Sequence, residues 1–203
     1  MGENMDSGAH DTRTVLMVGN PNVGKSALFN RLTGAEAVVS NYPGTTVDVT
    51  RGHFVDGGTR YEVIDVPGAY SLDTRDAAEE VAVRLLDAHP GAVVLLVLDA
   101  TRLERGLYLG FEVMERGAPV LVVLNMMDAA REKAITVDDR RLQVILGVPV
   151  VCTSAVLGEG IRHLADMLRK ARPADIGLVS ARANGTATEP PRPVGCIGCG
   201  GCR

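Results

Sequence analysis

The stretch Gly19-Asn-Pro-Asn-Val-Gly-Lys-Ser26 decides the fold, because it follows the β-branched run Thr14–Val18 and opens a helical pattern at Ser26–Leu32. It matches the form G-x-x-x-x-G-K-[ST], in which glycines let the backbone curl and turn successive N–H groups toward phosphate oxygens. In that form Lys25 reaches the β- and γ-phosphates, and the hydroxyl of Ser26 binds Mg²⁺. The alternative is a turn that only connects a strand to a helix, and the strand–loop–helix context argues against it.

Further apolar runs alternate with helical patterns and indicate a mostly parallel sheet covered by helices on both faces. The predicted strands are Thr14–Val18, Arg60–Ile64, Ala92–Leu98, Val120–Leu124 and Pro149–Val151, with Thr46–Val55 as an edge strand because its apolar and polar residues alternate. The predicted helices are Ser26–Leu32, Ala77–Ala88, Leu103–Arg116 and Gly160–Ala171. The expected fold is therefore α/β, a P-loop NTPase with a six-stranded, mostly parallel sheet flanked by helices.

The composition narrows the class of protein. The chain has 203 residues, of which 46% are hydrophobic and 23% charged, as in a globular protein with one domain of ordinary size. The formal net charge of −4 argues against binding to nucleic acid. The apolar run Ala92–Leu98 is too short to span a bilayer, and the first residues carry no secretory signal. These features predict a cytoplasmic protein without a transmembrane segment, either free or peripheral to the inner face of the membrane.

The chain divides into three predicted regions. Residues 1–12 are expected to be a disordered N-terminus, and residues 13–172 carry all the strand and helix patterns. Residues 173–203 are rich in proline and glycine and hold few large apolar groups. That composition is typical of a flexible tail.

A second motif selects the base of the nucleotide. Asn125-Met-Met-Asp128 directly follows the strand Val120–Leu124 and resembles the N-x-x-D guanine motif of GTPases. The carboxylate of Asp128 can accept hydrogen bonds from N1–H and the exocyclic amine of guanine, which adenine cannot supply. Thr153-Ser154-Ala155 also follows a strand and resembles the loop that offers a backbone N–H to guanine O6. Taken alone, Asn125 could be a polar strand cap.

The element Asp65-Val-Pro-Gly68 completes the set and also ends a strand. It matches the form D-x-x-G, in which Asp65 holds Mg²⁺ through a water and the Gly68 N–H contacts the γ-phosphate. By itself DVPG is a common turn sequence. The four motifs nevertheless stand in the right order, each at the carboxyl end of a strand, where ligands bind in open α/β sheets.

A family resemblance rests on three longer segments. Asn41-Tyr-Pro-Gly-Thr-Thr-Val-Asp48, then DVPGAYSL at residues 65–72 and EEVAVR at residues 79–84, resemble the G domain of ferrous iron transporter B (FeoB). Met126, where Ras-like proteins carry Lys, is a further mark of that family. The resemblance covers roughly residues 13–172 and implies a Ras-like G domain. It also implies that Thr46 is the switch threonine that contacts Mg²⁺ and the γ-phosphate.

Two positions bear on the expected mechanism of hydrolysis. Ala69 stands where Ras-type enzymes place the glutamine that orients water, so backbone groups must position the water and slow hydrolysis is expected. Asn22 matches the asparagine that in the FeoB family helps to hold K⁺ beside the phosphates, together with carbonyls here near Ser40–Tyr42. A cation there could stabilise charge as an arginine finger does. Asn22 could otherwise be only a loop-stabilising side chain.

The predicted site residues fall into three groups. The catalytic candidates are Asn22, Lys25, Thr46 and Gly68. The metal candidates are Ser26, Thr46 and Asp65 for Mg²⁺ and Asn22 for K⁺. The nucleotide-binding candidates are Gly19, Asn20, Pro21, Asn22, Val23, Gly24, Lys25, Ser26, Gly44, Thr45, Thr46, Asp65, Val66, Pro67, Gly68, Asn125, Met126, Met127, Asp128, Thr153, Ser154 and Ala155.

The tail holds a separate motif, Cys196-Ile-Gly-Cys199-Gly-Gly-Cys202. It resembles part of a bacterial ferredoxin cluster loop, but the fourth cysteine before proline is absent. The three thiolates suit zinc or an iron–sulfur cluster, with Cys152 as a conceivable fourth ligand. The alternative is a disordered tail with exposed thiols.

Three functions remain open from the sequence. The resemblance favours a GTPase switch, Mg-dependent and potassium-stimulated, that regulates Fe²⁺ uptake through a separately encoded membrane permease. The family's helical inhibitor domain and its permease have no counterpart in these residues, so the chain is either a stand-alone G protein or a fragment. The second function is an Era-like ribosome or RNA assembly GTPase, against which the acidic charge and Met126 argue. The third is a metal-cofactor maturation GTPase, for which the cysteines are the only support.

Overall fold

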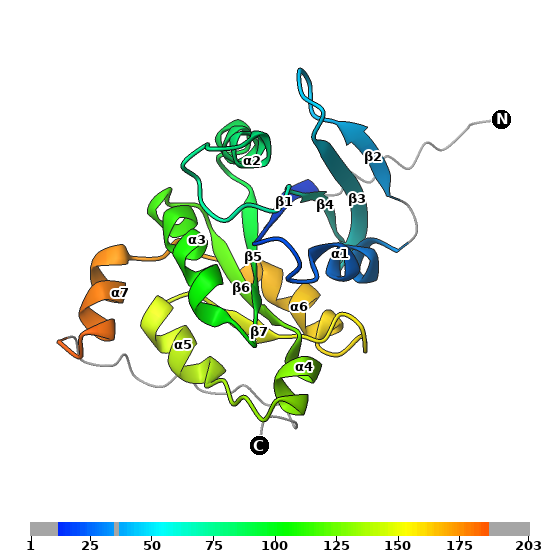
Figure 1. Ribbon diagram of the computed structural model, residues 1–203. Helices are drawn as coiled ribbons and strands as arrows, with labels where there is room; N and C mark the ends of the chain where they lie inside the picture. The colour runs from blue at the N-terminus through cyan, green and yellow to red at the C-terminus, as the bar shows by residue number, and fades with distance from the viewer. Residues whose placement is uncertain (1–11, 35–36, 187–203) are drawn as a thin grey trace.

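The computed structural model of the protein describes residues 12–34 and 37–186. Strands and helices alternate along most of the chain, as Figure 1 shows. The strands are β1 (Thr12–Val18), β2 (Val38–Asn41), β3 (Asp48–Asp56), β4 (Thr59–Asp65), β5 (Val93–Asp99), β6 (Val120–Asn125) and β7 (Val150–Cys152). The helices are α1 (Lys25–Thr33), α2 (Ala77–Ala88), α3 (Leu103–Glu115), α4 (Met127–Glu132), α5 (Asp139–Leu146), α6 (Ile161–Met167) and α7 (Ile176–Ala183), and a 3₁₀ turn, Leu168–Lys170, follows α6.

All seven strands form one sheet in the order β2-β3-β4-β1-β5-β6-β7. The five strands from β4 to β7 run parallel, whereas β3 pairs antiparallel with both β2 and β4. Because parallel strands share one direction, β4, β1, β5, β6 and β7 all end at the same edge of the sheet. The phosphate loop, D-x-x-G, N-x-x-D and the loop Thr153–Ala155 therefore all leave the sheet at that edge.

Each face of the sheet packs against its own hydrophobic core. Along β1, Leu16 and Val18 face the core formed with α2, α3 and α5, while Val15 and Met17 face the core formed with α1 and α6. Successive side chains of a strand point to opposite faces, so a strand covered on both sides reads as a continuous apolar run. Helices lie on both sides of the sheet in Figure 1. The predicted α/β fold is confirmed.

The sheet has seven strands rather than the predicted six, and the edge was placed wrongly. The missed strand is β2, a four-residue strand whose residues are all exposed. It lies at the edge, and β3 lies between it and β4. Within β3 only Val49 and Gly52 are buried, so burial along the strand does not follow the alternation of the sequence from which an edge strand was predicted. A strand as short and exposed as β2 carries no burial pattern in its sequence.

Three helices were also missed. The helices α4 and α5 lie between β6 and β7, in a stretch for which no element was predicted. The helix α7 lies within the predicted flexible tail, so that prediction is wrong for residues 176–183. Val179 of α7 is buried and packs in the same core as α5, and Arg182 donates a hydrogen bond from Nη1 to the carbonyl of Val144 at 3.1 Å. Tertiary contacts therefore stabilise a helix that its composition does not predict.

Candidate nucleotide-binding site

The predicted phosphate loop leaves β1 and enters α1 in a tightly curled form. Asn22 and Gly24 both have positive φ, 65° and 84°, the left-handed region that turns a chain sharply. A Cβ atom on Gly24 would lie 2.4 Å from Nδ2 of Asn125, so only glycine fits there. The loop thus has the shape expected of a backbone that surrounds phosphates.

Lys25, Ser26 and Asp65 converge beside this loop. The ammonium of Lys25 donates hydrogen bonds to the carbonyls of Gly19 at 3.2 Å and Asn20 at 3.4 Å. The hydroxyl of Ser26 donates to Oδ2 of Asp65 at 3.4 Å, and Oδ1 of Asp65 is buried without a hydrogen-bond partner among the described residues. The loop and the end of β4 therefore present an ammonium, a hydroxyl and a carboxylate together.

Burial has the largest effect on the pKa values of Lys25 and Asp65. Burial lowers the pKa of Lys25 from its ordinary value, and the charge of Asp65 opposes that shift. Burial likewise raises the pKa of Asp65, opposed by Lys25 and by the hydrogen bond from Ser26. Since desolvation is the larger effect for both groups, their mutual attraction does not compensate fully for burial. Such an arrangement favours ligands that bring both negative charge for Lys25 and positive charge for Asp65.

Asn125 joins three of the predicted motifs. It is the last residue of β6 and is 2% exposed. Its Nδ2 donates to the carbonyl of Val23 in the phosphate loop at 2.9 Å. Its Oδ1 accepts from the hydroxyl of Thr153 and from the N–H of Ala155, both at 3.1 Å. Both polar atoms of the buried amide are therefore hydrogen-bonded, and it is a connector rather than only a strand cap.

Asp128 is oriented by the neighbouring loop. The hydroxyl of Ser154, which is completely buried, donates to Oδ1 of Asp128 at 2.7 Å. This leaves Oδ2 with no hydrogen bond to the described residues. Met126, between Asn125 and Asp128, has a φ of 63° and lets the chain turn from β6 into α4. The loop Thr153-Ser154-Ala155 was expected to offer a backbone N–H to guanine O6, and in this structure the N–H of Ala155 donates to Asn125.

The D-x-x-G element begins residues 65–75, which are expected to respond to the γ-phosphate and are called the second switch, and Gly68 within it packs against the phosphate loop. A Cβ atom on Gly68 would lie 3.0 Å from the backbone N of Pro21, so this close approach requires glycine. Val66 and Ala69 are buried, at 0% and 2% exposed. Farther along, Glu79 of α2 accepts hydrogen bonds from the N–H groups of Ser71 and Arg75. The phosphate loop thus packs against Gly68, and Glu79 holds the segment that follows it.

The predicted switch threonine, Thr46, lies in the connection between β2 and β3. These two strands form a hairpin, which is called the first switch. The N–H of Tyr42 donates to the carbonyl of Val47 at 2.8 Å, and Thr45 donates to the carbonyl of Tyr42 through both its N–H and its hydroxyl, each at 3.0 Å. Thr46 is exposed at the tip, and no hydrogen bond within residues 12–34 and 37–186 joins it to Ser26 or Asp65. The structure therefore does not bring Thr46 to the other predicted Mg²⁺ ligands. Gly44, beside it, has a φ of 79°.

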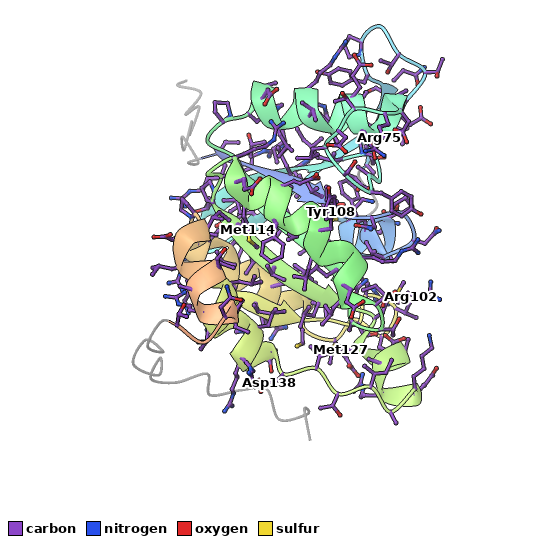
Figure 2. The ribbon with its side chains drawn as sticks, turned by 60° about the vertical axis from the view of Figure 1, so that its left-hand side comes forward. Arg75, Arg102, Tyr108, Met114, Met127 and Asp138 are labelled. Carbon is purple, nitrogen blue, oxygen red and sulfur yellow. The ribbon has the colours of Figure 1, made fainter. Side chains whose placement is uncertain are left out.

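Two hollows lie near the start of α3, and neither is lined by residues from all of the predicted nucleotide-binding motifs. One of about 130 Å³ lies between Asn20–Val23 and the start of α3, beside Tyr70. Another of about 670 Å³ lies between the start of α3 and α5, and none of the predicted nucleotide-binding residues lines it. In Figure 2, Arg102 and Met127, which follow β5 and β6, lie toward the same side of the molecule.

The cysteine motif lies outside the described residues. Cys196, Cys199 and Cys202 fall within residues 187–203, and the predicted disordered N-terminus, residues 1–12, is described only at Thr12. Cys152, the conceivable fourth ligand, is the last residue of β7 and is partly buried. In the part of the chain that the structure describes, no three His, Cys, Asp or Glu side chains form a metal-binding group.

Sequence reasoning missed two residues that hold the site together. Glu79 is 5% exposed and anchors the second switch. The pattern Asp76-x-x-Glu79 is a helix-start signal that could have drawn attention to it, because Asp76 caps the N–H of Glu79 at 2.8 Å. Arg31 of α1 reaches the carbonyls of Ala155 and Val156. No local signal reveals that contact, since the partners lie 124 and 125 residues away.

None of the helices among residues 12–34 and 37–186 combines the length and apolar character needed to cross a bilayer.

Comparison with known proteins places the chain in a family. The family described as ferrous iron transport protein B matches residues 13–168. A fusion protein of Fe(2+) transport protein A and Fe(2+) transporter FeoB from Porphyromonas gingivalis is 42% identical over 156 residues, which are 76% of this chain and 18% of the relative. The Fe(2+) transporter FeoB of Salmonella typhimurium is 38% identical over 155 residues, 74% of this chain and 20% of the relative. The chain thus spans about one-fifth of these relatives.

Solved structures agree with the sequence comparison. The cytosolic domain of the T. maritima FeoB iron transporter, in a GDP form, has a TM-score of 0.76 and 36% identity and covers 83% of this chain and 68% of that one. The isolated G domain of the same transporter has a TM-score of 0.73 and 38% identity, over 78% of this chain and 97% of that one. The fold, the order of the motifs and these matches agree: the chain belongs to the ferrous iron transport protein B family and carries its G domain.

Proposed function

We propose that the protein binds GTP and GDP, hydrolyses GTP slowly with Mg²⁺, and acts as a switch that regulates ferrous iron transport through a membrane permease. The observation that carries the nucleotide part is the hydrogen-bond network of Asn125, which joins the phosphate loop at Val23 to the base loop at Thr153 and Ala155. A connection of this kind holds the phosphate-binding and base-binding halves of one site in register.

Guanine selectivity follows from the way in which the Asp128 carboxylate is hydrogen-bonded. Ser154 occupies one carboxylate oxygen and fixes the plane of the group. The second oxygen is then directed to accept from N1–H and the exocyclic amine of guanine. Adenine would leave this carboxylate without those donors, at a cost that supports strong discrimination. The N–H of Ala155, now donated to Asn125, can serve guanine O6 only by sharing that hydrogen bond or exchanging it.

Mg²⁺ fits the pair Ser26 and Asp65. The buried Oδ1 of Asp65 lacks a partner in the described part of the chain, and hydroxyl and carboxylate oxygens are the ligands that a hard cation prefers. When bound there with nucleotide, the ion would neutralise charge that develops on the phosphates. Lys25 would hold the β- and γ-phosphates from the other side, and Thr46 would join the site only after the hairpin tip moves.

The proposed K⁺ site rests on the amide oxygen of Asn22 in the phosphate loop. Its φ of 65° lies in the left-handed region, which asparagine adopts more readily than most other non-glycine residues, so the backbone conformation alone is compatible with a cation ligand and with a loop-stabilising side chain. We infer that the amide oxygen of Asn22 contributes to a monovalent cation site beside the phosphates. Buried Ala69 supplies no group that could orient water, and this supports slow hydrolysis that depends on other charges.

The iron-transport part rests on family membership. The relatives are named as Fe(2+) transporters, and the family match favours this function over ribosome assembly or cofactor maturation. Iron uptake by cells that lack the protein should fall and should be restored by the wild-type chain but not by a Lys25→Ala variant. Restoration by Lys25→Ala would contradict the switch. Metal binding by Cys196, Cys199 and Cys202 stays a prediction from the sequence.

Competition binding tests the nucleotide proposal directly. Unlabelled GDP should displace a fluorescent GDP analogue at concentrations at least about 100-fold below those of ADP. Asp128→Asn should weaken GDP and favour xanthosine diphosphate, because the amide offers a donor to the extra carbonyl of xanthine. Asp138→Asn, which makes the same carboxylate-to-amide change at the start of α5 and keeps an oxygen that can accept from the Arg141 N–H, is the matched control and should leave selectivity unchanged. Equal displacement by ADP and GDP in the wild type would remove the proposal.

A further inference from the structure

We propose that Arg31 is a positioning residue for the guanine-recognition loop, and that its contacts set the rate at which bound GDP leaves. This inference rests on the proposed binding of guanine nucleotides. Arg31 belongs to α1, the helix that the phosphate loop opens. Its Nε donates to the carbonyl of Ala155 at 2.9 Å and its Nη2 to the carbonyl of Val156 at 2.6 Å. The planar guanidinium therefore holds two successive carbonyls at once.

The held residues are those that contact the base-reading side chains. Ala155 donates its N–H to Asn125 on one side and gives its carbonyl to Arg31 on the other. In a trans peptide the carbonyl and the following N–H point in opposite directions, so Arg31 also fixes the N–H groups of Val156 and Leu157. Consistent with this, the N–H of Leu157 points toward the hydroxyl of Ser154 at 3.4 Å. Arg31 thereby determines the orientation of the whole turn.

Little else holds the tip of this loop. The turn lies between Ser154 and Glu159, whose backbones pair through two hydrogen bonds of 3.1 Å. Val156 and Leu157 are 70% and 59% exposed, so burial of apolar surface does not anchor them. On the far side, Arg131 of α4 forms an ion pair with Glu159, at the base of the turn rather than at its tip. Among the described residues, Arg31 alone donates hydrogen bonds from a side chain to the tip.

The contacts of Arg31 are expected to affect the release of GDP rather than the cleavage of GTP. Guanine can leave only when the loop beside Asn125 and Asp128 yields, and a loop held to α1 yields less often. The phosphates lie at the opposite end of the site, where Lys25, Ser26 and Asp65 converge. Loss of Arg31 should therefore accelerate dissociation of the nucleotide and leave the cleavage step unchanged. A residue that merely supported the fold would alter both.

Stopped-flow release of fluorescent GDP into excess unlabelled GDP tests this assignment with the full chain. Arg31→Ala should release GDP about five- to tenfold faster than the wild type, which is the effect of two charge-assisted hydrogen bonds at an exposed site. Arg31→Lys keeps the charge but has no planar fork, and it should lie between the two. Arg84→Ala, which removes an exposed arginine paired with Glu80 on α2, is the control and should match the wild type.

A second measurement separates positioning from general support. Single-turnover cleavage of pre-bound GTP should proceed at the wild-type rate in Arg31→Ala. Release at the wild-type rate, or cleavage slowed as much as release is accelerated, would overturn the role of Arg31. A wild-type protein that binds GDP no better than ADP would overturn the proposed function and this inference together. Normal guanine preference with unchanged release in Arg31→Ala would overturn this inference alone.

Discussion

The two ends of the candidate site differ in how completely the protein chain builds them. At the base end, Asn125, Thr153 and Ser154 are at most 2% exposed, and the Thr153 hydroxyl donates to Asn125 while the Ser154 hydroxyl donates to Asp128. At the first switch, Thr46 is exposed at the tip of a hairpin that lies at the edge of the sheet. The base end is therefore preorganised, whereas we expect the first switch to be brought into place by its ligand.

This difference matches what each end must do. GTP and GDP carry the same base, so a rigid base-binding site does not reduce the ability of the protein to distinguish GTP from GDP. The γ-phosphate is present in only one of them, and a switch must respond to that difference. The second switch is intermediate, because Gly68 packs on Pro21 while Glu79 anchors the following turn. Changes at Lys25, Thr46, Asn22 and Asp128 test this contrast.

The largest effect is expected at Lys25, which serves both halves of the phosphate site. Lys25→Ala should weaken GDP and GTP alike by about 100-fold, because it removes charge-assisted hydrogen bonds to two phosphates. Isothermal titration calorimetry with each nucleotide measures the change. Lys133→Ala, on the surface after α4, should bind as the wild type does. An equal affinity of Lys25→Ala and wild type would show that the nucleotide lies elsewhere.

The next effect concerns Thr46 and sharpens the contrast between the two ends. Thr46→Ala should leave GDP affinity within about twofold of the wild type and slow GTP hydrolysis about tenfold, since its hydroxyl acts only when the switch is ordered. Thr50→Ala in β3 serves as the matched control. If Thr46→Ala weakened GDP as much as it slowed hydrolysis, the first switch would belong to the preorganised part of the site.

The smallest effect is the response to monovalent cations. The wild type should hydrolyse GTP about fivefold faster in KCl than in NaCl at equal ionic strength, as a stabilising charge beside the phosphates would allow. Asn22→Gly removes the amide while tolerating the positive φ, so a loss of the response in this variant reflects the side chain and not backbone strain. Equal rates of the wild type in the two salts would contradict the cation site.

The base-selectivity prediction at Asp128 completes the comparison. It probes the rigid end alone, so Asp128→Asn should change which base is bound without changing the potassium response. A variant that altered both would indicate that the two ends are coupled more tightly than their separate contacts suggest.

Local sequence determined the elements whose signals are local. The phosphate loop lies between a strand and a helix because glycines at fixed spacing and flanking apolar periodicity each act over a few residues. For the same reason the predicted helix Ala77–Ala88 coincides with α2. The placement of Asp65 and Asn125 as the last residues of β4 and β6 also followed from apolar runs that end at polar residues.

Tertiary structure decided what depends on distant partners. The short edge strand β2 exists through its pairing with β3, and α7 through its packing on α5, so neither has a periodic signal of its own. The hydrogen bonds from Asn125 to Val23 and from Arg31 to Ala155 join residues that are far apart in the chain. Such contacts form only when the folded sheet brings these elements together. A local sequence pattern indicates burial and turns but not which surfaces meet, and it therefore does not predict these contacts.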